Sequence, residues 1–572
     1  MAIFLIRRGW LAALTVTLIV SQLAAKPHTG STHSAVGSRY AVATVQPLAT
    51  DAAMAVFEEG GNAVDAAIAA ALTLSVVDNH NSGIGGGCLC LVRTPAGELL
   101  AIDGRETAPA LATPEMFVVG GEADPRLSQT GPLAVGTPGA LAAYALLAKT
   151  AGSKPLSRLL EPGRRAAAEG FAIDKNYADR LKSNAKELGK FPATRAVFLD
   201  AEGQPHREGH PLVQADLAKT YGALIENGPD WFYRGPFAQR VGAWMQAEGG
   251  RLRASDFATY KALRREPIVS TYRGRQIIGF PPPSSGGVHV AQVLNLIERY
   301  ELSTLFEDDP LTATHVVAEA MKIAFADRAH WLGDSDFVEV PRGLSAKSYA
   351  DQLAGKIRLK RVTQVKSHGE PPEWRQDVFG RHTTHIAAAD AEGYWVAITA
   401  TVNTGFGSKV IVPGTGVILN NEMDDFSIQP GTPNAFGLVG AANNAVAAGK
   451  RPLSSMSPTL VLDAEGRPLM ALGAAGGPKI ISQVILMLIN TVDRQMSLAE
   501  AVAAPRWHHQ WRPDVLSVEK GFDPGLLLGL LDRGHTLTQL PTAGVGQAIG
   551  RDAEDRLIAV NDPRVAGKSA AR

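Results

Sequence analysis

Cysteine is nearly absent from this chain: only Cys88 and Cys90 occur in 572 residues. A disulfide framework is therefore excluded as the source of stability. The two cysteines lie two positions apart in a predicted strand, so their side chains point to the same face. We expect two buried, unreactive thiols, because the neighbouring sequence lacks the further Cys or His ligands of a metal site.

An excess of either charge is also missing, with 56 Lys and Arg against 56 Asp and Glu. This balance argues against a nucleic acid or an anionic membrane that is recognised through bulk charge. Metal-ligand spacing is absent as well, because His382 and His385 lie on opposite faces of an extended segment and His508 and His509 are adjacent. We predict no metal and no cofactor.

The sequence lacks a long, well-flanked apolar run of the kind that spans a membrane. The first 25 residues combine Arg7-Arg8, an apolar segment at 10–20 and small residues at 21–25, which predicts a secretory signal. An uncleaved signal anchor is the alternative. We therefore expect a secreted or periplasmic protein, membrane-anchored if the segment is retained, and little regular structure in residues 26–39.

A β-hairpin is predicted across residues 381–403, where two β-branched and apolar runs flank a short loop ending in glycine. A three-residue loop would pair Asp390 with Tyr394. The same register brings Thr383 opposite Thr401, so two hydroxyls meet. Each threonine alone is an ordinary strand residue with good β propensity.

Four blocks of sequence resemble the γ-glutamyltransferase (glutathione hydrolase) family: Thr383–His385, Thr401–Gly407, Leu419–Ser427 and Lys450–Pro458. The resemblance extends from about Tyr40 to Pro563. It implies an α+β fold, a four-layer αββα sandwich of the N-terminal nucleophile hydrolase type, formed jointly by two chains cleaved from one precursor. After the signal at 1–25, the large subunit would be 26–382 and the small catalytic subunit 383–572. The charged segment 354–381 is expected to be an exposed strap that leads to the cleavage site.

The resemblance also implies the site residues. The bond between His382 and Thr383 would be cleaved, and Thr383 would be the nucleophile. The remaining matches are Thr401, which would orient the nucleophile; Gly476 and Gly477, which would stabilise the oxyanion; Arg105, Ser454 and Ser455, which would hold the substrate α-carboxylate; Asn403, Glu422 and Asp425, which would hold its α-ammonium; and Phe436, which would form an aromatic lid where bacterial members often have Tyr. Ala474 and Ala475 replace the Ser-Pro that family members usually carry before the two glycines.

A threonine hydroxyl needs a base, and neither a Ser-His-Asp arrangement nor a Gly-x-Ser-x-Gly elbow is present in the sequence. Cleavage before Thr383 would supply an α-amine that titrates near pH 7.7–8.0 in model compounds. By resemblance, the enzyme would cleave the γ-glutamyl bond of glutathione and pass the acyl group to water or to an amino-acid or peptide acceptor. The alternatives are a glutaryl or cephalosporin acylase of the same fold, or an unprocessed binding homologue.

Overall fold

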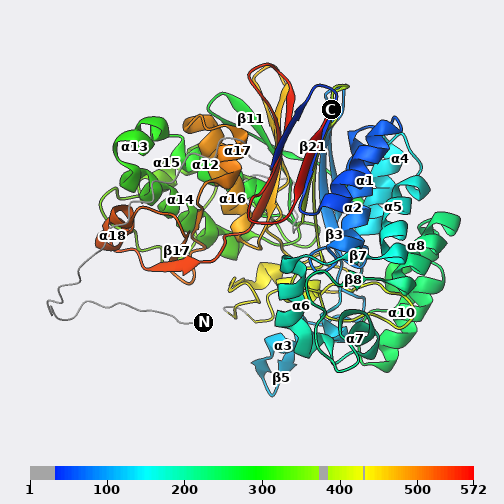
Figure 1. Cartoon of the computed structure of the whole chain (residues 1–572). Helices are drawn as coiled ribbons and strands as arrows, with labels where there is room; N and C mark the ends of the chain where they lie inside the picture. The colour runs from blue at the N-terminus through cyan, green and yellow to red at the C-terminus, as the bar shows by residue number, and fades with distance from the viewer. Residues whose placement is uncertain (1–32, 373–383, 430–431) are drawn as a thin grey trace, which may run out of the picture. The chain divides into compact units, whose positions relative to one another are not determined.

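The computed structural model describes residues 33–372, 384–429 and 432–572 (Figure 1). The signal predicted at 1–25 and the cleavage site predicted at His382–Thr383 lie outside the described residues. Mixed helices and strands confirm the expected α/β content. Among the described helices, none is both long enough and apolar enough to cross a membrane.

The predicted nucleophile hairpin lies in the middle of an antiparallel sheet of seven strands. Its strands, in spatial order, are β21 (Lys568–Ala571), β2 (Tyr40–Thr44), β12 (His385–Asp390), β13 (Trp395–Thr401), β3 (Gly87–Arg93), β4 (Leu99–Gly104) and β9 (Leu263–Arg265). The hairpin predicted around Gly393 is present, and β3 and β4 form a second hairpin in the same sheet. Cys88 and Cys90 are buried free thiols, 3.9 Å apart on one face of β3, as expected.

A second antiparallel sheet of seven strands contains the hairpin that precedes the two glycines. Its strands, in spatial order, are β1 (Ser34–Gly37), β20 (Leu557–Asn561), β19 (Val545–Arg551), β15 (Pro468–Ala475), β14 (Thr459–Leu462), β11 (Arg275–Gly279) and β10 (Ile268–Tyr272). The expectation for residues 26–39 is wrong at β1, which pairs with β20 near the other end of the chain.

The two sheets pack face to face through small apolar side chains. Ala387, Ala389 and Ala397 of the hairpin share a buried cluster with Leu460 and Ala471 of the second sheet. Because side chains alternate along a strand, the other hairpin positions, such as Ile386 and Ile398, point to the opposite face and enter a separate core with the helices. The hairpin is therefore buried on both faces, which fixes its register.

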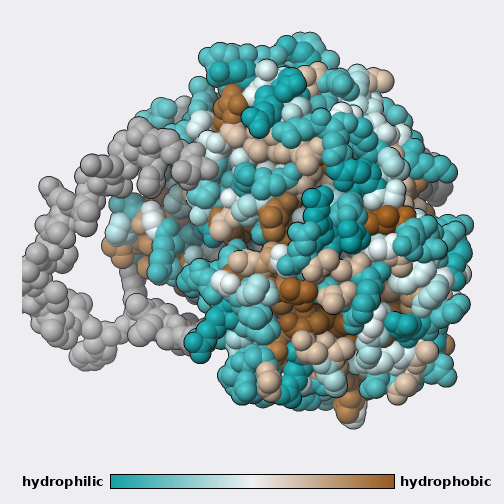
Figure 2. Space-filling model, turned by 45° about the vertical axis from the view of Figure 1, so that its right-hand side comes forward, coloured by the Kyte–Doolittle hydropathy of each residue, from teal (hydrophilic) through white to brown (hydrophobic). Residues whose placement is uncertain are grey.

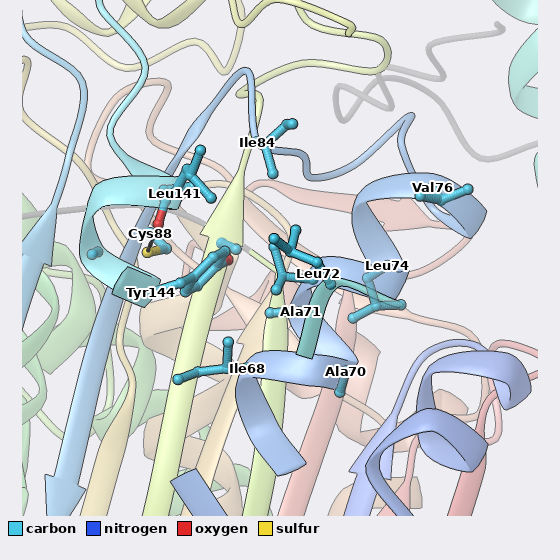
Figure 3. Packing of buried hydrophobic residues seen from close by; sticks show 14 of the residues in the cluster. Ile68, Ala70, Ala71, Leu72, Leu74, Val76, Ile84, Cys88, Leu141 and Tyr144 are labelled. Carbon is cyan, nitrogen blue, oxygen red and sulfur yellow. Dashed lines mark hydrogen bonds between the residues drawn. The ribbon is translucent and has the colours of Figure 1, made fainter. Parts of the chain in front are cut away.

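Helices cover the outer face of each sheet (Figure 1). Against the first sheet lie α1 (Pro47–Glu58), α2 (Ala63–Val77) and α4 (Ala140–Ala151), while α5 (Leu156–Glu169) packs on α2 and α8 (Ala215–Asn227) packs on α5. Against the second sheet lie α12 (Gly286–Ile297), α16 (Lys479–Leu488) and α17 (Leu498–Ala503), while α14 (Pro310–Trp331) packs on α12. Figure 3 shows Ile68 and Leu72 of α2 and Tyr144 of α4 over the strands, with Tyr144 beside Cys88. The other helices are α3 (Pro125–Gln129), α6 (Lys175–Leu188), α7 (Pro192–Phe198), α9 (Asp230–Tyr233), α10 (Pro236–Ala247), α11 (Ala254–Thr259), α13 (Leu302–Asp308), α15 (Lys347–Ala354) and α18 (Pro524–Asp532).

Short strand pairs complete the described structure: β5 (Val118–Val119) with β6 (Glu122–Ala123), β7 (Phe171–Ala172) with β8 (Pro211–Leu212), and β16 (Trp507–His508) with β17 (Leu516–Glu519) and β18 (Leu537–Leu540). The charged strap is mostly exposed as far as residue 372. It is nevertheless held to α14, because Asp327 accepts the Gly369 N–H at 2.6 Å. Figure 2 shows a mainly hydrophilic surface with hydrophobic side chains in small groups.

Candidate active site

The hairpin has the register that the sequence predicts. His385 lies opposite Thr399 and Ala389 lies opposite Trp395. This is the register that would place Asp390 opposite Tyr394 and Thr383 opposite Thr401. The ladder extends to Thr384, whose carbonyl accepts the Ala400 N–H at 2.5 Å. Thr383 and His382 lie outside the described residues, so the meeting of Thr383 with Thr401 stays a prediction.

Thr401 ends β13 and is 1% exposed. Its hydroxyl oxygen accepts the Asn403 N–H at 2.7 Å, which leaves the hydroxyl hydrogen available to donate to another group. The strand end is covered by the glycine-rich bend before β3, because a Cβ on Gly86 would lie 1.9 Å from the Thr401 carbonyl oxygen. The bend at 82–87 therefore lies in direct contact with the backbone of Thr401.

Asn403 has a left-handed backbone conformation, with φ of 78°. Such values are uncommon outside glycine, and Asn tolerates them better than most residues. Its side-chain N–H donates to the Asn421 carbonyl at 3.0 Å, while its buried Oδ1 has no hydrogen-bond partner among the described residues. An acceptor held in this way is suited to an incoming N–H donor, as the predicted contact with an α-ammonium requires.

Arg105 follows β4 and is fully buried, but its guanidinium is occupied by protein groups. Nη2 donates to Asp425 at 2.8 Å, and Nη1 donates to Glu422 and lies 3.5 Å from Glu106. Nε donates to the Pro452 carbonyl at 3.2 Å. The structure therefore brings together one residue predicted to bind carboxylate and two predicted to bind ammonium, as partners of each other.

The ionisation of this cluster follows from its burial. Burial raises the pKa of Glu422 well above its ordinary value, and the Arg105 charge opposes that shift. Burial likewise raises the pKa of Glu106 to about 7, again opposed by Arg105. Burial alone would lower the pKa of Arg105, but the surrounding carboxylates outweigh it and the pKa rises. Arg105 therefore stays a cation, while burial disfavours the ionised forms of Glu106 and Glu422.

Ser454 and Ser455 form a second part of the candidate site, and both are fully buried. The Ser454 hydroxyl has no hydrogen-bond partner among the described residues. Arg328 of α14 reaches the same place, with Nη2 at 3.5 Å from the Ser455 hydroxyl and Nε at 3.3 Å from the Ser285 hydroxyl. Arg328 was not among the residues singled out from the sequence, because its contacts with Ser285 and Ser455 join segments that are distant in sequence.

The two glycines lie between β15 and α16. Gly476 and Gly477 have φ values of 143° and 61°, which L side chains rarely adopt. Their position just before a helix start suits an anion, because unpaired N–H groups and the helix dipole favour negative charge there. Phe436 covers them: a Cβ on Gly477 would lie 2.8 Å from the Phe436 ring. The aromatic cover is therefore in contact with the predicted oxyanion site.

A cavity of about 370 Å³ opens beside these residues. Its walls include Thr384, Asn403, Phe436, Gly476 and Gly477, so it reaches the position that follows the predicted nucleophile. The size is within the usual range for small-molecule sites. The walls also carry charged and polar groups that sequence reasoning did not single out: Asp78, His80, Asn81, Asp174, Arg180 and Lys479.

One group of described residues has the composition of a metal site. His315 and Glu319 of α14 and His535 offer ligand atoms within 4.8 Å of one another. The Lys322 ammonium already lies 2.8 Å from Glu319, and the two imidazoles are in hydrogen-bond contact at 2.7 Å. The Glu319 carboxylate is therefore paired with a lysine, and the two histidines share a hydrogen bond. Because these side chains already have protein partners, the cluster is no evidence for a metal, and the prediction that the protein uses none stays a prediction.

Comparisons with known proteins agree on one family. The family model described as Gamma-glutamyltranspeptidase matches residues 49–572. A glutathione hydrolase proenzyme of Escherichia coli is 42% identical over 527 residues, which cover 91% of this chain and 90% of that protein. An acylase ACY 1 proenzyme of a Pseudomonas species is 37% identical over 522 residues, covering 89% of each chain.

Solved structures of the same kind superpose on the model. A cephalosporin acylase from Bacillus halodurans matches with a TM-score of 0.85 and 28% identity, over 97% of this chain and 99% of that one. The γ-glutamyltranspeptidase of Helicobacter pylori matches with a TM-score of 0.56 and 38% identity, over 60% of this chain and 97% of that one.

Proposed function

The chain belongs to the γ-glutamyltranspeptidase family, and on this premise we propose that it is a proenzyme that cleaves itself into a γ-glutamyl hydrolase and transpeptidase acting on glutathione. One observation carries the proposal: a buried cluster of both charges, Arg105 with Glu422 and Asp425, is joined to the segment that covers the two glycines at a helix start. Asn434 of that segment donates to Asp425 at 3.1 Å, and Phe436 lies against Gly477. Such a cluster can hold the zwitterionic end of a glutamyl group while the γ-carbonyl reacts elsewhere.

We propose that maturation cleaves the bond between His382 and Thr383, giving a large subunit of residues 26–382 and a small subunit of residues 383–572. Two packed sheets with helices on their outer faces support a four-layer αββα sandwich of the N-terminal nucleophile hydrolase type. Both sheets contain strands from each proposed subunit, which supports a fold formed jointly by the two chains. Neither half has a complete sheet of its own. The two subunits must therefore stay associated after cleavage.

In the proposed mechanism, the freed α-amine of Thr383 removes the proton from its own hydroxyl. The hydroxyl oxygen attacks the γ-carbonyl carbon, and the N–H groups of Gly476 and Gly477 stabilise the oxyanion. The leaving amine departs with the proton, and an acyl-enzyme remains. Water or an acceptor amine then attacks that ester, giving hydrolysis or transfer. Thr401 keeps the nucleophile oriented through its free hydroxyl hydrogen.

The acylase alternative is disfavoured by the carboxylates. Glutaryl substrates lack the α-amine of γ-glutamyl substrates, and Glu422 and Asp425 would then have no cationic ligand. Three carboxylates, those of Glu106, Glu422 and Asp425, lie around the Arg105 guanidinium, so the cluster can accept the positive charge of a substrate ammonium. This balance supports a substrate with an ammonium group.

We propose secretion or periplasmic export through the segment at 1–25, with membrane anchoring if that segment is retained. The proposed partners are the γ-glutamyl substrate, water or an amino-acid or peptide acceptor, and the other subunit of the same precursor.

A denaturing gel combined with an anilide assay tests the proposal. Purified wild-type protein should run as two fragments that divide at Thr383 and should release aniline from a γ-glutamyl anilide. Full-length protein without activity would favour the binding homologue. Two fragments with a faster rate on the glutaryl anilide would favour the acylase.

A further inference from the structure

We propose that Gln510 is a positioning residue that fastens the aromatic cover over the oxyanion loop, by bonding to the backbone of Phe436. The cover lies on the turn 434–438, the cover turn, and the oxyanion loop is the proposed pair Gly476 and Gly477. The effect on catalysis rests on the γ-glutamyl activity proposed above and deepens it. The fastening itself can be measured without that activity.

The Phe436 side chain has no polar atom, so its ring cannot donate a hydrogen bond to the loop that it covers. The ring lies against Gly477, where an added Cβ would be 2.8 Å from it. Apolar burial and dispersion favour such a contact, but these forces have little directional preference. The directional bonds that position the ring therefore come from the backbone and the neighbouring side chains of the cover turn.

One side of the cover turn is tied to the segment that carries the buried carboxylates. Asn434 Oδ1 accepts the Phe436 N–H at 3.0 Å, and Asn434 Nδ2 donates to Asp425 at 3.1 Å. The Ala435 N–H donates to Asp424 at 3.0 Å. These bonds hold the start of the turn, ahead of the Phe436 carbonyl.

Gln510 holds the other side of the cover turn. Its Nε2 donates to the Phe436 carbonyl at 3.2 Å and to the Arg512 carbonyl at 3.3 Å. An amide nitrogen carries two hydrogens, so both bonds can form together. The reverse orientation of the amide would turn its oxygen toward two carbonyls, which can only accept. The contact with Phe436 therefore depends on which way the Gln510 amide faces.

A hydrogen-bond chain from α16 fixes that orientation. Gln510 Oε1 lies 2.9 Å from His508 Nε2, and His508 Nδ1 lies 2.7 Å from the Ser482 hydroxyl. Burial lowers the pKa of His508 to about 3, so its imidazole is neutral at pH 7 and carries one proton. Because the Gln510 oxygen can only accept, that proton is on Nε2, and Nδ1 accepts from Ser482. The amide nitrogen of Gln510 is thereby turned toward Phe436.

The chain of bonds starts in the helix that follows the two glycines. Ser482 lies in the first turns of α16, directly after Gly477 and Pro478. The cover and the loop under it are therefore both attached to α16, which fixes their relative position. A closed cover excludes water from the reacting bond and strengthens the polar contacts around it. Loosening the cover should lower kcat/KM and should raise the share of acyl-enzyme that is hydrolysed.

Hydrogen exchange of the cover turn tests the fastening directly. Gln510→Met removes the amide at similar length, whereas Gln510→Glu keeps the shape and an acceptor for His508 but presents an oxygen to the Phe436 carbonyl. In both variants the amides of 434–438 should exchange about 2- to 12-fold faster than in wild type, the range expected for one hydrogen bond. Gln539→Met is the matched control, because Gln539 is an exposed glutamine of β18, and it should leave this exchange unchanged.

A double-mutant cycle connects the fastening to catalysis. With a γ-glutamyl anilide as donor and glycylglycine as acceptor, Gln510→Met should lower kcat/KM by about 2- to 12-fold and raise the hydrolysed share. In Phe436→Ala, the same substitution should have little further effect, because no ring remains to be positioned. A merely structural role of Gln510 would instead multiply the losses of the two single variants.

Unchanged exchange of the cover turn in both Gln510 variants would overturn the proposal, and so would losses in kcat/KM that multiply in the double variant. Failure of both Gln510 variants to give folded protein would also overturn it, because Gln510 would then act in folding. A wild-type protein that is inactive on the γ-glutamyl anilide would refute the proposed function, while the exchange result would still decide whether Gln510 fastens the cover.

Discussion

Replacing Asp425 with Asn tests whether the buried carboxylates select an ammonium. Asp425 is 2% exposed and lies 2.8 Å from Arg105, and Glu422 shares the same guanidinium. Truncating one partner of a buried charge pair costs about 2–5 kcal/mol, or roughly 30- to 4000-fold in kcat/KM. We expect the lower end of this range, because Glu422 can still face the ammonium.

The assay compares γ-glutamyl and glutaryl anilides at neutral pH. Wild type should strongly prefer the γ-glutamyl anilide. In Asp425→Asn, the γ-glutamyl rate should fall while the glutaryl rate changes little, so the preference should shrink. Asp424→Asn is the matched control, because that neighbouring carboxylate bonds to Ser128 and the Ala435 N–H instead. It should affect both substrates equally. Equal losses in Asp425→Asn, or equal wild-type rates, would refute the reasoning.

Four further outcomes are expected. Thr383→Ala should give an inactive protein that runs as one full-length band on a denaturing gel, and Thr383→Ser should be cleaved slowly. Two fragments in the Ala variant would exclude Thr383 as the nucleophile. Thr401→Ala should still be cleaved but lose about 1.5–3 kcal/mol of transition-state stabilisation in kcat, and full activity would contradict its orienting role. Gly477→Ala should lower kcat, because φ of 61° is strained for Ala and the new Cβ would lie 2.8 Å from Phe436; an unchanged kcat would argue against the oxyanion loop. Burial raises the pKa of Asp78 from 3.8 to about 8, so its contribution to stability is present below about pH 4 and lost as pH rises towards 8. The melting temperature should therefore fall less between pH 5.5 and 8.5 in Asp78→Asn than in wild type. An identical fall in the two proteins would contradict the raised pKa of Asp78.

Local patterns carried most of the correct sequence predictions. The hairpin register followed from the two-residue period and a short loop, and the described pairs match it down to Thr384. The strands before the two glycines and the helix after them also have local signals, a turn sequence at 463–466 and an apolar run at 480–489. Such features depend on neighbours in sequence, which is why they can be predicted without the fold.

Long-range pairing could not be predicted in the same way. Arg105 and Glu422 are 317 positions apart, and nothing in the local sequence indicates that they neutralise each other. In α14, Glu319, Lys322 and Arg328 suggest a solvated face, yet all three are buried. Glu319 contacts Thr363, Lys322 contacts Asp514 and Arg328 contacts Ser455. Segments distant in sequence therefore pack over the side of the helix that carries these charges. The position of Arg328 in the site depends on this tertiary packing.

The charge balance of the buried cluster suggests how the site could be selective in its resting state. The carboxyl groups of Glu106, Glu422 and Asp425 lie around Arg105, and burial raises the pKa of Glu106 to about 7 and that of Glu422 well above its ordinary value. A γ-glutamyl group adds one charge of each sign, so it leaves the net charge of the cluster unchanged. A glutaryl group adds only the negative charge, and a 4-aminobutyryl group adds only the positive one. Each analogue therefore changes the net charge of a buried cluster, which is unfavourable in a site shielded from water. We accordingly expect the site to prefer a zwitterionic group over either singly charged analogue.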